Sequence, residues 1–176
     1  MNDPNWRLPE VPSFTLTSPD FASGAPLPRS ARGAGAGGED RSPALAWSGQ
    51  PAGTRSYVLS CFDPDAPTQS GWWHWVVQDL PGDLTALPAG AGTPSSGPLP
   101  SDAIVHASDA GVLGYQGAAP PAGHGEHRYV FTLSALDVDR LGLPATATPA
   151  LVSFMLRDHL LARAQLTGTS ITPAEG

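Results

Sequence analysis

Two aspartates, three tryptophans and a histidine lie within the short run from Cys61 to Trp75. Prolines alternate with Asp63 and Asp65, and proline fixes φ and lacks an N–H donor, so this run cannot form a helix or a central strand. The residue before each proline is also pushed towards extended geometry. The run is therefore predicted to be a stiff loop that holds its carboxylates, together with His74, in fixed directions. Loops of this kind are where binding sites are usually built.

A second loop rich in glycine and proline begins at Gly114 and leads into a strand at its far end. Side chains two residues apart on a strand point to the same face, so His127 and Tyr129 are expected to act together. Arg128 then points to the opposite face, where we expect a structural role and an acidic partner. His124 lies among glycines and is expected to be an exposed histidine rather than a ligand.

Three motifs follow one another along these two loops. They are Asp63-Pro64-Asp65-Ala66-Pro67, Gly71-Trp72-Trp73-His74-Trp75 and Gly117-Ala118-Ala119-Pro120-Pro121 with His127-Arg128-Tyr129 behind it. In this order they resemble the signature of the phosphatidylethanolamine-binding protein (PEBP) family. The run from Leu160 to Gly168 resembles the end of its bacterial, Raf-kinase-inhibitor-like branch. The resemblance covers nearly the whole chain and implies a mainly β (α+β) fold, an antiparallel β-sandwich with a C-terminal helix.

The resemblance also implies that the two loops meet in a pocket for phosphate, acetate or phosphoryl head groups. The side chains at the matching positions are Asp63, Asp65, Trp72, His74, Pro121, His127 and Tyr129, and the backbone of Gly123 and Gly125 forms the adjoining turn. Imidazole N–H, phenol O–H and a nest of backbone N–H groups can together hold an anion.

Carboxylates in such a pocket need a partner other than the anion. A neighbouring aspartate orients a histidine and raises its pKa, so anion binding is expected to strengthen as the pH falls. Asp63 is the expected orienting group. Asp65 either joins the pocket or fixes its own loop, and the sequence leaves both readings open.

The same histidine, aspartate and tyrosine side chains allow general acid–base chemistry, so a lyase, isomerase or cyclase is the alternative function. A hydrolase is disfavoured because the chain has no Gly-x-Ser-x-Gly elbow or other activated nucleophile. His124, His127 and His74 are ligand types that zinc accepts, but their loop-and-strand spacing does not favour a metal. We therefore expect no catalytic residue, no metal and no cofactor. The resemblance adds a second alternative, a protein partner or protease inhibition, and implies a homodimer.

Charge and composition exclude several other classes. The chain has 176 residues, a net charge of −7 and no lysine. Nucleic acids and anionic membranes need clustered cations, so neither nucleic-acid binding nor a strong membrane anchor is expected. Cys61 has no second cysteine to pair with and is expected to be a buried small side chain. No apolar leader is visible, which predicts a cytoplasmic protein.

Residues 1–12 are polar and contain several prolines, which predicts a loose N-terminal arm, and the chain length predicts a single domain at 13–176. Alternating apolar and polar residues predict the strands. The expected strands are Ser13–Ser18, Leu45–Ser48, Ser56–Phe62, Trp75–Leu80, Ala103–His106 and Arg128–Leu136. Thr148 followed by Pro149 is typical of a helix start. A helix is predicted from Ala150 to Leu166, with Gly168 as its stop. His106 and His159 have no partner that the sequence identifies.

Overall fold

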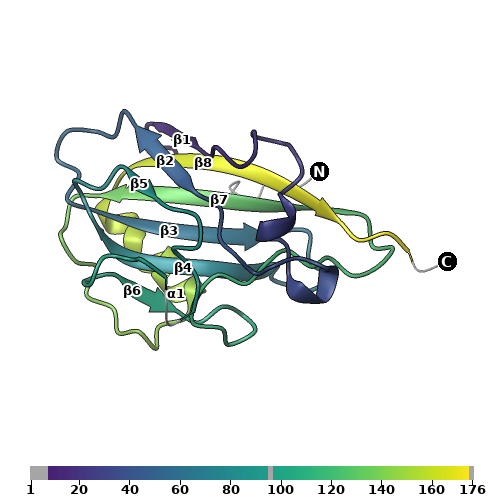
Figure 1. The fold of residues 1–176 in the computed structure, drawn as a ribbon. Helices are drawn as coiled ribbons and strands as arrows, with labels where there is room; N and C mark the ends of the chain where they lie inside the picture. Colours follow the sequence, from purple (N-terminus) through teal and green to yellow (C-terminus); the bar gives the residue numbers. More distant parts are fainter. Residues whose placement is uncertain (1–7, 95–96, 175–176) are drawn as a thin grey trace.

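The computed structural model describes residues 8–94 and 97–174, which form two antiparallel sheets with an α-helix beside the larger one (Figure 1). The larger sheet has the strand order β6-β4-β3-β7-β8. Its strands are β3 (Ser56–Asp63), β4 (Trp72–Pro81), β6 (Ile104–His106), β7 (Glu126–Leu136) and β8 (Leu160–Ile171). The smaller sheet has the order β1-β2-β5, with β1 (Thr15–Thr17), β2 (Leu45–Ser48) and β5 (Ala86–Leu87). The helical segments are α1 (Pro149–Met155) and the short 3₁₀ turns η1 (Arg29–Ala31), η2 (Ala34–Ala36) and η3 (Leu156–His159).

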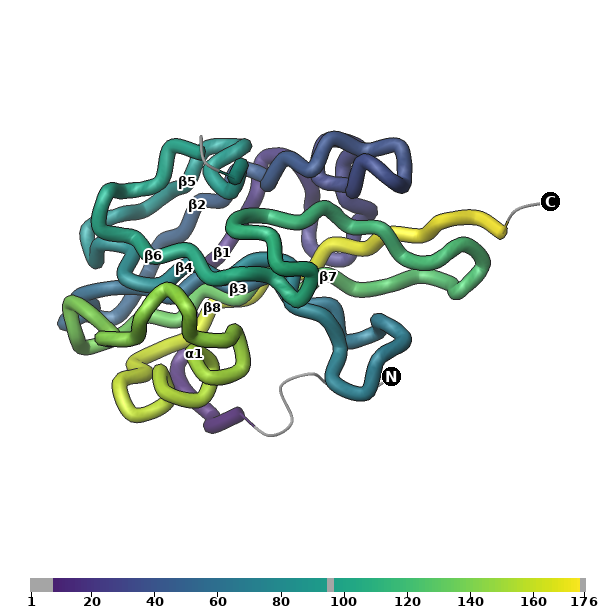
Figure 2. The backbone as a smooth tube through the Cα atoms, turned by 90° about the horizontal axis from the view of Figure 1, so that it is seen from below, coloured from purple at the N-terminus to yellow at the C-terminus, as the bar shows by residue number. Residues whose placement is uncertain are grey.

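Strand alternation divides the side chains of the larger sheet between two cores. On β3, Tyr57, Leu59 and Cys61 face the smaller sheet and belong to the main core. Val58 points to the other face, where it packs with Val152 of α1. Figure 2 shows the larger sheet between the smaller sheet on one side and α1 on the other. Each loop at the end of this sheet is therefore held between two packed layers.

Most of the predicted strands are confirmed, and the antiparallel β-sandwich with a helix near its C-terminal end is the fold that the sequence predicts. Cys61 is buried, as expected for a small apolar side chain in a strand. One boundary differs at the site. Strand β4 begins at Trp72, so Trp72, Trp73 and His74 lie on a strand rather than in the stiff loop that was predicted for them.

The helix α1 begins as predicted but ends much earlier. Thr148 Oγ1 accepts a hydrogen bond from the Leu151 N–H at 3.2 Å, and Pro149 occupies the first turn. The helix buries Val152, whereas the exposed fractions of Leu151 and Met155 are 43% and 38%. Only part of the apolar surface of α1 is therefore buried against the sheet.

The predicted helix from Ala150 to Leu166 is wrong beyond Met155, because residues 160–171 form strand β8. Ala162, Ala164 and Leu166 are buried and alternate with more exposed residues, as on a strand that packs one face. Pairing along the whole of β7 outweighs the helix propensity of this Leu- and Ala-rich run. Gly168 does not stop a helix either. It pairs with Tyr129, and a Cβ there would lie 2.5 Å from Leu27 Cδ2.

The outer edge of β8 is covered by the N-terminal part of the chain. The Arg163 N–H donates to Pro12 O at 3.0 Å, and the N–H groups of Gly24 and Leu27 donate to Thr167 O and Thr169 O, each at 2.7 Å. An open strand edge would otherwise offer a template for pairing with another chain. The proposed arm at 1–12 stays a prediction, since residues 1–7 lie outside the described residues.

Candidate anion-binding site

The two loops that the sequence singles out lie at the same end of the larger sheet, beyond the end of β3 and the start of β7 (Figure 2). The first is a turn at 64–71 that joins β3 to β4. The second is held by backbone hydrogen bonds to the segment before it, from the Gly33 N–H to Ala118 O at 2.8 Å and from the Ala118 N–H to Ala31 O at 3.1 Å. Their positions therefore depend on the folded core rather than on the loops alone.

A β-bulge points His74 towards this end of the sheet. Trp73 pairs with Phe62 and Trp75 pairs with Cys61, so His74 is the extra residue of β4 with no partner on β3. A bulge re-aims a side chain without disturbing the strand on either side, and bulges are common beside sites for this reason. The His74 ring consequently meets the Tyr129 ring edge to face, with centroids 5.0 Å apart.

A cavity of about 270 Å³ opens between the loops. It is lined by Asp63, Ala66, Pro67, Thr68, Trp72, His74, Gln116, Ala119, Pro120, Pro121, His127 and Tyr129. The structure thus brings together six of the side chains that the sequence nominates, from four separate segments. Their carboxylate, imidazole and phenol groups are the polar part of an otherwise apolar lining.

A chain of hydrogen bonds runs from the buried cavity wall towards the surface. His127 Nδ1 donates to Asp63 Oδ2 at 2.8 Å, and both side chains are almost fully buried. On its other side, His127 Nε2 lies 2.7 Å from His124 Nδ1, so one proton is shared between the two rings. Asp63 is therefore placed to orient His127, as the sequence suggests. His124 is exposed, as the sequence predicts, and in addition it closes the outer end of this chain.

His74 has a defined protonation form. Its Nδ1 lies 2.9 Å from the backbone oxygen of Gln116, which can only accept, so Nδ1 carries the proton. Burial lowers the pKa of His74 from its ordinary value, although the bond to Gln116 opposes this shift. The net rise in pKa expected from a neighbouring aspartate is thus wrong for His74, because loss of solvation outweighs the upward effect of Asp63 and Asp109. A neutral His74 presents Nε2 as an acceptor.

Tyr129 remains a neutral phenol. Burial raises the pKa of Tyr129 far above its ordinary value, and the nearby Asp63 carboxylate raises it further. The phenol O–H is therefore available as a donor at any physiological pH. Trp72 is also fixed, since its Nε1 donates to Gln116 Oε1 at 3.0 Å.

Asp65 does not line the cavity. Its carboxylate accepts from Arg128 Nε and Nη2, each at 2.7 Å, and from the Arg128 N–H at 2.9 Å. These bonds lower the pKa of Asp65, the side-chain bond to Arg128 most of all. Of the two roles left open for Asp65, the geometry supports the one in which it fixes its own loop. Asp65 is also the acidic partner that the sequence leads us to expect for Arg128.

The backbone nest is not supported by the geometry. Gly123 and Gly125 adopt the left-handed φ angles of 75° and 104° that a nest needs. However, the Gly123 N–H donates to Thr172 O at 3.0 Å and the His124 N–H donates to Pro121 O at 3.1 Å. Two of the three amides in this turn are therefore unavailable to an anion.

Two residues of the site escaped sequence reasoning. Gln116 holds both His74 and Trp72, and His124 closes the chain at His127. Gln116 stands beside the second motif, so its position was a weak signal. Within the described residues, no group of three His, Cys, Asp or Glu side chains is arranged to hold a metal ion.

Comparison with known proteins gives the site its context. The family model described as phosphatidylethanolamine-binding protein matches residues 17–171. This chain belongs to the phosphatidylethanolamine-binding protein family. It is 46% identical over 154 residues to the protein YbhB of Escherichia coli, covering 86% of this chain and 96% of YbhB. The crystal structure of E. coli YbcL is similar at a TM-score of 0.85 and 38% identity, covering 90% of this chain and 98% of YbcL.

Membership of the PEBP family does not decide where the protein resides. A relative from Mycobacterium tuberculosis that is named as a lipoprotein, LppC, is 36% identical over 169 residues, covering 95% of this chain and 77% of LppC. None of the helices in residues 8–94 and 97–174 is long and apolar enough to cross a membrane. The cytoplasmic location stays a prediction.

Proposed function

We propose that this PEBP-family chain binds small oxyanions in the cavity between the two loops, with phosphoryl head groups of the phosphoethanolamine type as the best-fitting class. One observation carries the proposal. Asp63, His74, His127 and Tyr129 come from three strands and present carboxylate, imidazole and phenol groups to one cavity. The buried bond between His127 and Asp63, at 2.8 Å, fixes the ring before any ligand arrives. Binding groups that are already ordered lose little entropy on binding.

The protonation of the site favours a particular form of the ligand. Tyr129 offers an O–H donor, whereas neutral His74 offers Nε2 as an acceptor. A phosphoryl group that keeps one proton supplies both complements, an oxygen for Tyr129 and a P–OH for His74. No arginine or lysine lines the cavity, and Asp63 does, so a fully ionised phosphate is disfavoured there. The second pKa of phosphate monoesters is about 6, so this form grows as the pH falls.

Binding of phosphoethanolamine at pH 5.5 and pH 8, followed by NMR of the histidine and tyrosine side chains, tests the proposal. We expect tighter binding at pH 5.5 and shifts at His74 and His127 together. Tyr129→Phe removes one hydroxyl without changing the shape of the ring, and we expect it to weaken binding about tenfold, the value of a hydrogen bond to a charged group. His159→Ala is the matched control, because His159 is half exposed and bonded only to Asp137.

The outcomes separate ligand protonation from protein protonation. Dimethyl phosphate has no second proton to gain, so its weak binding should not change between the two pH values. If it also binds more tightly at pH 5.5, the protein titrates and the account of His74 fails. If both Tyr129→Phe and His127→Ala bind phosphoethanolamine as the unchanged protein does, the site lies elsewhere.

The hydrogen-bonded chain from Asp63 through His127 to His124 favours a second candidate, acid–base catalysis on a small phosphorylated substrate. Such a chain can pass a proton between the buried carboxylate and the surface. Deuterium incorporation next to the carbonyl of dihydroxyacetone phosphate in heavy water is a direct assay. Exchange above that of His127→Ala would support an enzyme, and equal rates would leave binding as the function.

A further inference from the structure

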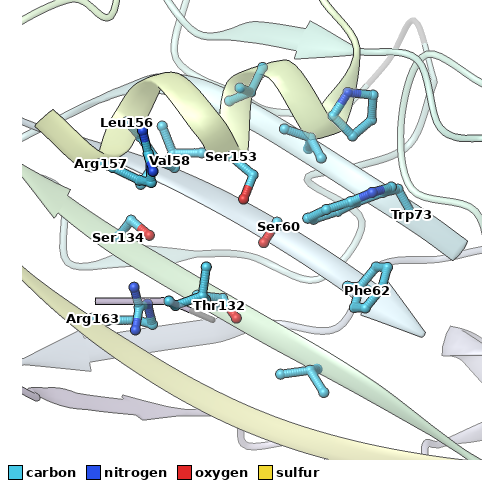
Figure 3. A pocket seen from close by; sticks show the side chains of 15 residues that line it. Val58, Ser60, Phe62, Trp73, Thr132, Ser134, Ser153, Leu156, Arg157 and Arg163 are labelled. Atoms are coloured by element: carbon cyan, nitrogen blue, oxygen red, sulfur yellow. The ribbon is translucent and has the colours of Figure 1, made fainter. Parts of the chain in front are cut away.

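A second cavity, of about 190 Å³, lies on the opposite face of the larger sheet, beneath α1 (Figure 3). It is lined by Leu8, Val58, Ser60, Phe62, Trp73, Val76, Val130, Thr132, Ser134, Pro149, Val152, Ser153, Leu156, Arg157 and Arg163. On β3, β4 and β7, residues of this cavity alternate with residues of the anion site, as Phe62 does with Asp63 and Trp73 with His74. The two cavities therefore share strands but no side chains.

The long axis of this cavity follows the strands. Arg163 pairs with Ser134 at one end, and Phe62 pairs with Trp73 at the other. On β3, Val58 pairs with Ser134, so the two ends lie four residues apart at Val58 and Phe62, which corresponds to about 14 Å at ~3.4 Å per residue. Figure 3 shows Arg157, Ser134 and Arg163 towards one end and Phe62 and Trp73 towards the other. One end is thus cationic and the other is aromatic.

The aromatic end is preformed. The rings of Phe62 and Trp73 lie 4.6 Å apart between centroids with an angle of 45° between their planes. Aliphatic side chains of α1 and η3, including Val152 and Leu156, line the rest of the cavity, whereas this end is formed by the two rings. Such an end accepts an aryl ring or a short alkyl chain.

The cationic end has charges that the protein does not balance. Arg157 and Arg163 are the two charged residues that line the cavity, and neither has a carboxylate within 4.0 Å among the described residues. By contrast, Arg29, Arg55 and Arg128 each form an ion pair. In a chain with a net charge of −7, two unpaired arginines at one cavity are notable.

The contacts of the two arginines leave donors free. Arg157 Nε donates to Phe154 O at 2.9 Å, and its guanidinium lies 4.0 Å from the centre of the Phe154 ring. Arg163 Nη1 makes a long bond of 3.4 Å to Pro9 O. Burial lowers the pKa of Arg163 from its ordinary value. A desolvated guanidinium without a counter-ion gains most from an anion placed beside it.

Ser134 adds a neutral donor at the same end. Its exposed fraction is 4%, and it lines the cavity. A serine hydroxyl carries one O–H donor, which can serve an acceptor placed in the cavity. A carboxylate oxygen would serve both this hydroxyl and a neighbouring guanidinium.

We infer that this second cavity binds a small monocarboxylate with an apolar tail, its carboxylate between Arg157, Arg163 and Ser134 and its tail against Phe62 and Trp73. The volume sets the size of the occupant. A cavity of about 150 Å³ holds one benzene molecule, so ~190 Å³ suits one ring or a short chain with a carboxylate attached. This site does not depend on the proposed anion site, since the two lie on opposite faces of the sheet.

Phenylacetate is the probe, and phenylacetamide is its uncharged counterpart of the same shape. Titrations of the full chain by calorimetry and by NMR of the Trp73 indole are expected to show phenylacetate binding at least tenfold more tightly than phenylacetamide. Arg157→Gln with Arg163→Gln should remove this preference. Arg29→Gln is the matched control, because it removes an exposed arginine from elsewhere on the surface.

A filled cavity gives an independent check. Ser60→Leu places an apolar side chain in the middle of the cavity and should abolish phenylacetate binding while leaving phosphoethanolamine binding unchanged. Equal affinity for the acid and the amide, binding that survives Ser60→Leu, or no binding up to millimolar concentrations would each overturn the inference. So would a homodimer in solution that dissociates on Phe154→Ser, because a second copy would then be the occupant of this face.

Discussion

At the scale of single residues, the site is controlled by which nitrogen carries which proton. Neutral His74 keeps its proton on Nδ1, and His127 is held between Asp63 and His124. Ring identities alone suggest several donors for an anion. The hydrogen bonds instead leave one acceptor, one phenol donor and a shared proton between two rings, and the proposed selectivity for a protonated ligand rests on this arrangement.

His124 competes with a ligand for His127. His124 Nδ1 is hydrogen-bonded to His127 Nε2 at 2.7 Å, so a ligand that bonds to His127 Nε2 must displace His124. His124→Ala is therefore expected to bind phosphoethanolamine about two- to tenfold more tightly, the equivalent of one net hydrogen bond of ~0.5–1.5 kcal/mol. Calorimetric titration of the variant measures this. Weaker binding would mean that His124 contacts the ligand itself.

His74 also makes stability depend on pH. Its pKa in the folded chain lies below the ordinary value of 6.5, so between these two values the unfolded chain binds more protons. The free energy of unfolding must then fall as the pH is lowered below about 6.5, by up to ~1.4 kcal/mol per pH unit for this one group. Urea unfolding at pH 7.5 and 5.5 should show a smaller fall for His74→Gln than for the unchanged chain. An equal fall would show that His74 is not buried as a neutral ring.

At the scale of elements, most strands were predictable from the sequence, but the last strand, β8, was not. Alternation along residues 56–62 and 128–136 identified β3 and β7, because each buries one face against a core. Ala162, Ala164 and Leu166 alternate in the same way, but their high helix propensity and the true helix start at Thr148 favoured a helix. Local propensity is weak against eleven pairs with β7, and those pairs could not be seen in one sequence.

The candidate site was predicted only in part, because contacts between distant residues cannot be read from one sequence. Residue types and motifs pointed to Asp63, His74, His127 and Tyr129, since each stands in a recognisable run. Which amides of the glycine turn are already bonded, and that His124 folds back on His127, depends on the path of the loop. The second cavity depends on how α1 sits on the sheet, and no motif marks it.

Gly168 tests the assignment of β8. A methyl group there would lie 2.5 Å from Leu27 Cδ2 and 3.1 Å from Phe21 Cε2, so Gly168→Ala should lower the free energy of unfolding by about 1–3 kcal/mol through overpacking. Gly35→Ala is the control, because nothing lies within 4 Å of an added Cβ and its φ is not positive. Denaturant unfolding of both variants measures the change in the free energy of unfolding. No loss for Gly168→Ala would argue against the close contact between β8 and residues 21–27.

At the scale of the whole molecule, one sheet separates two chemically different cavities. Because the cavities share strands but no side chains, we expect phosphoethanolamine and phenylacetate to bind independently. At ten times its dissociation constant, each ligand should add ~1.4 kcal/mol to the free energy of unfolding, and both together about twice that amount. Thermal unfolding with each ligand alone and with both together shows whether the two stabilising free energies add. A combined effect no larger than the greater single one would mean that the ligands compete.

The bulge in β4 makes the proposed anion site separable from the fold in evolutionary terms. His74 is an insertion between two regularly paired residues, so a single-codon deletion would bring Trp73 and Trp75 together and leave their partners, Phe62 and Cys61, in register. The alternation of side chains between the two cores would survive on both sides of the deletion. A descendant of this chain could thus lose its imidazole at the loop end in one genetic event and retain the sheet, the helix and the second cavity.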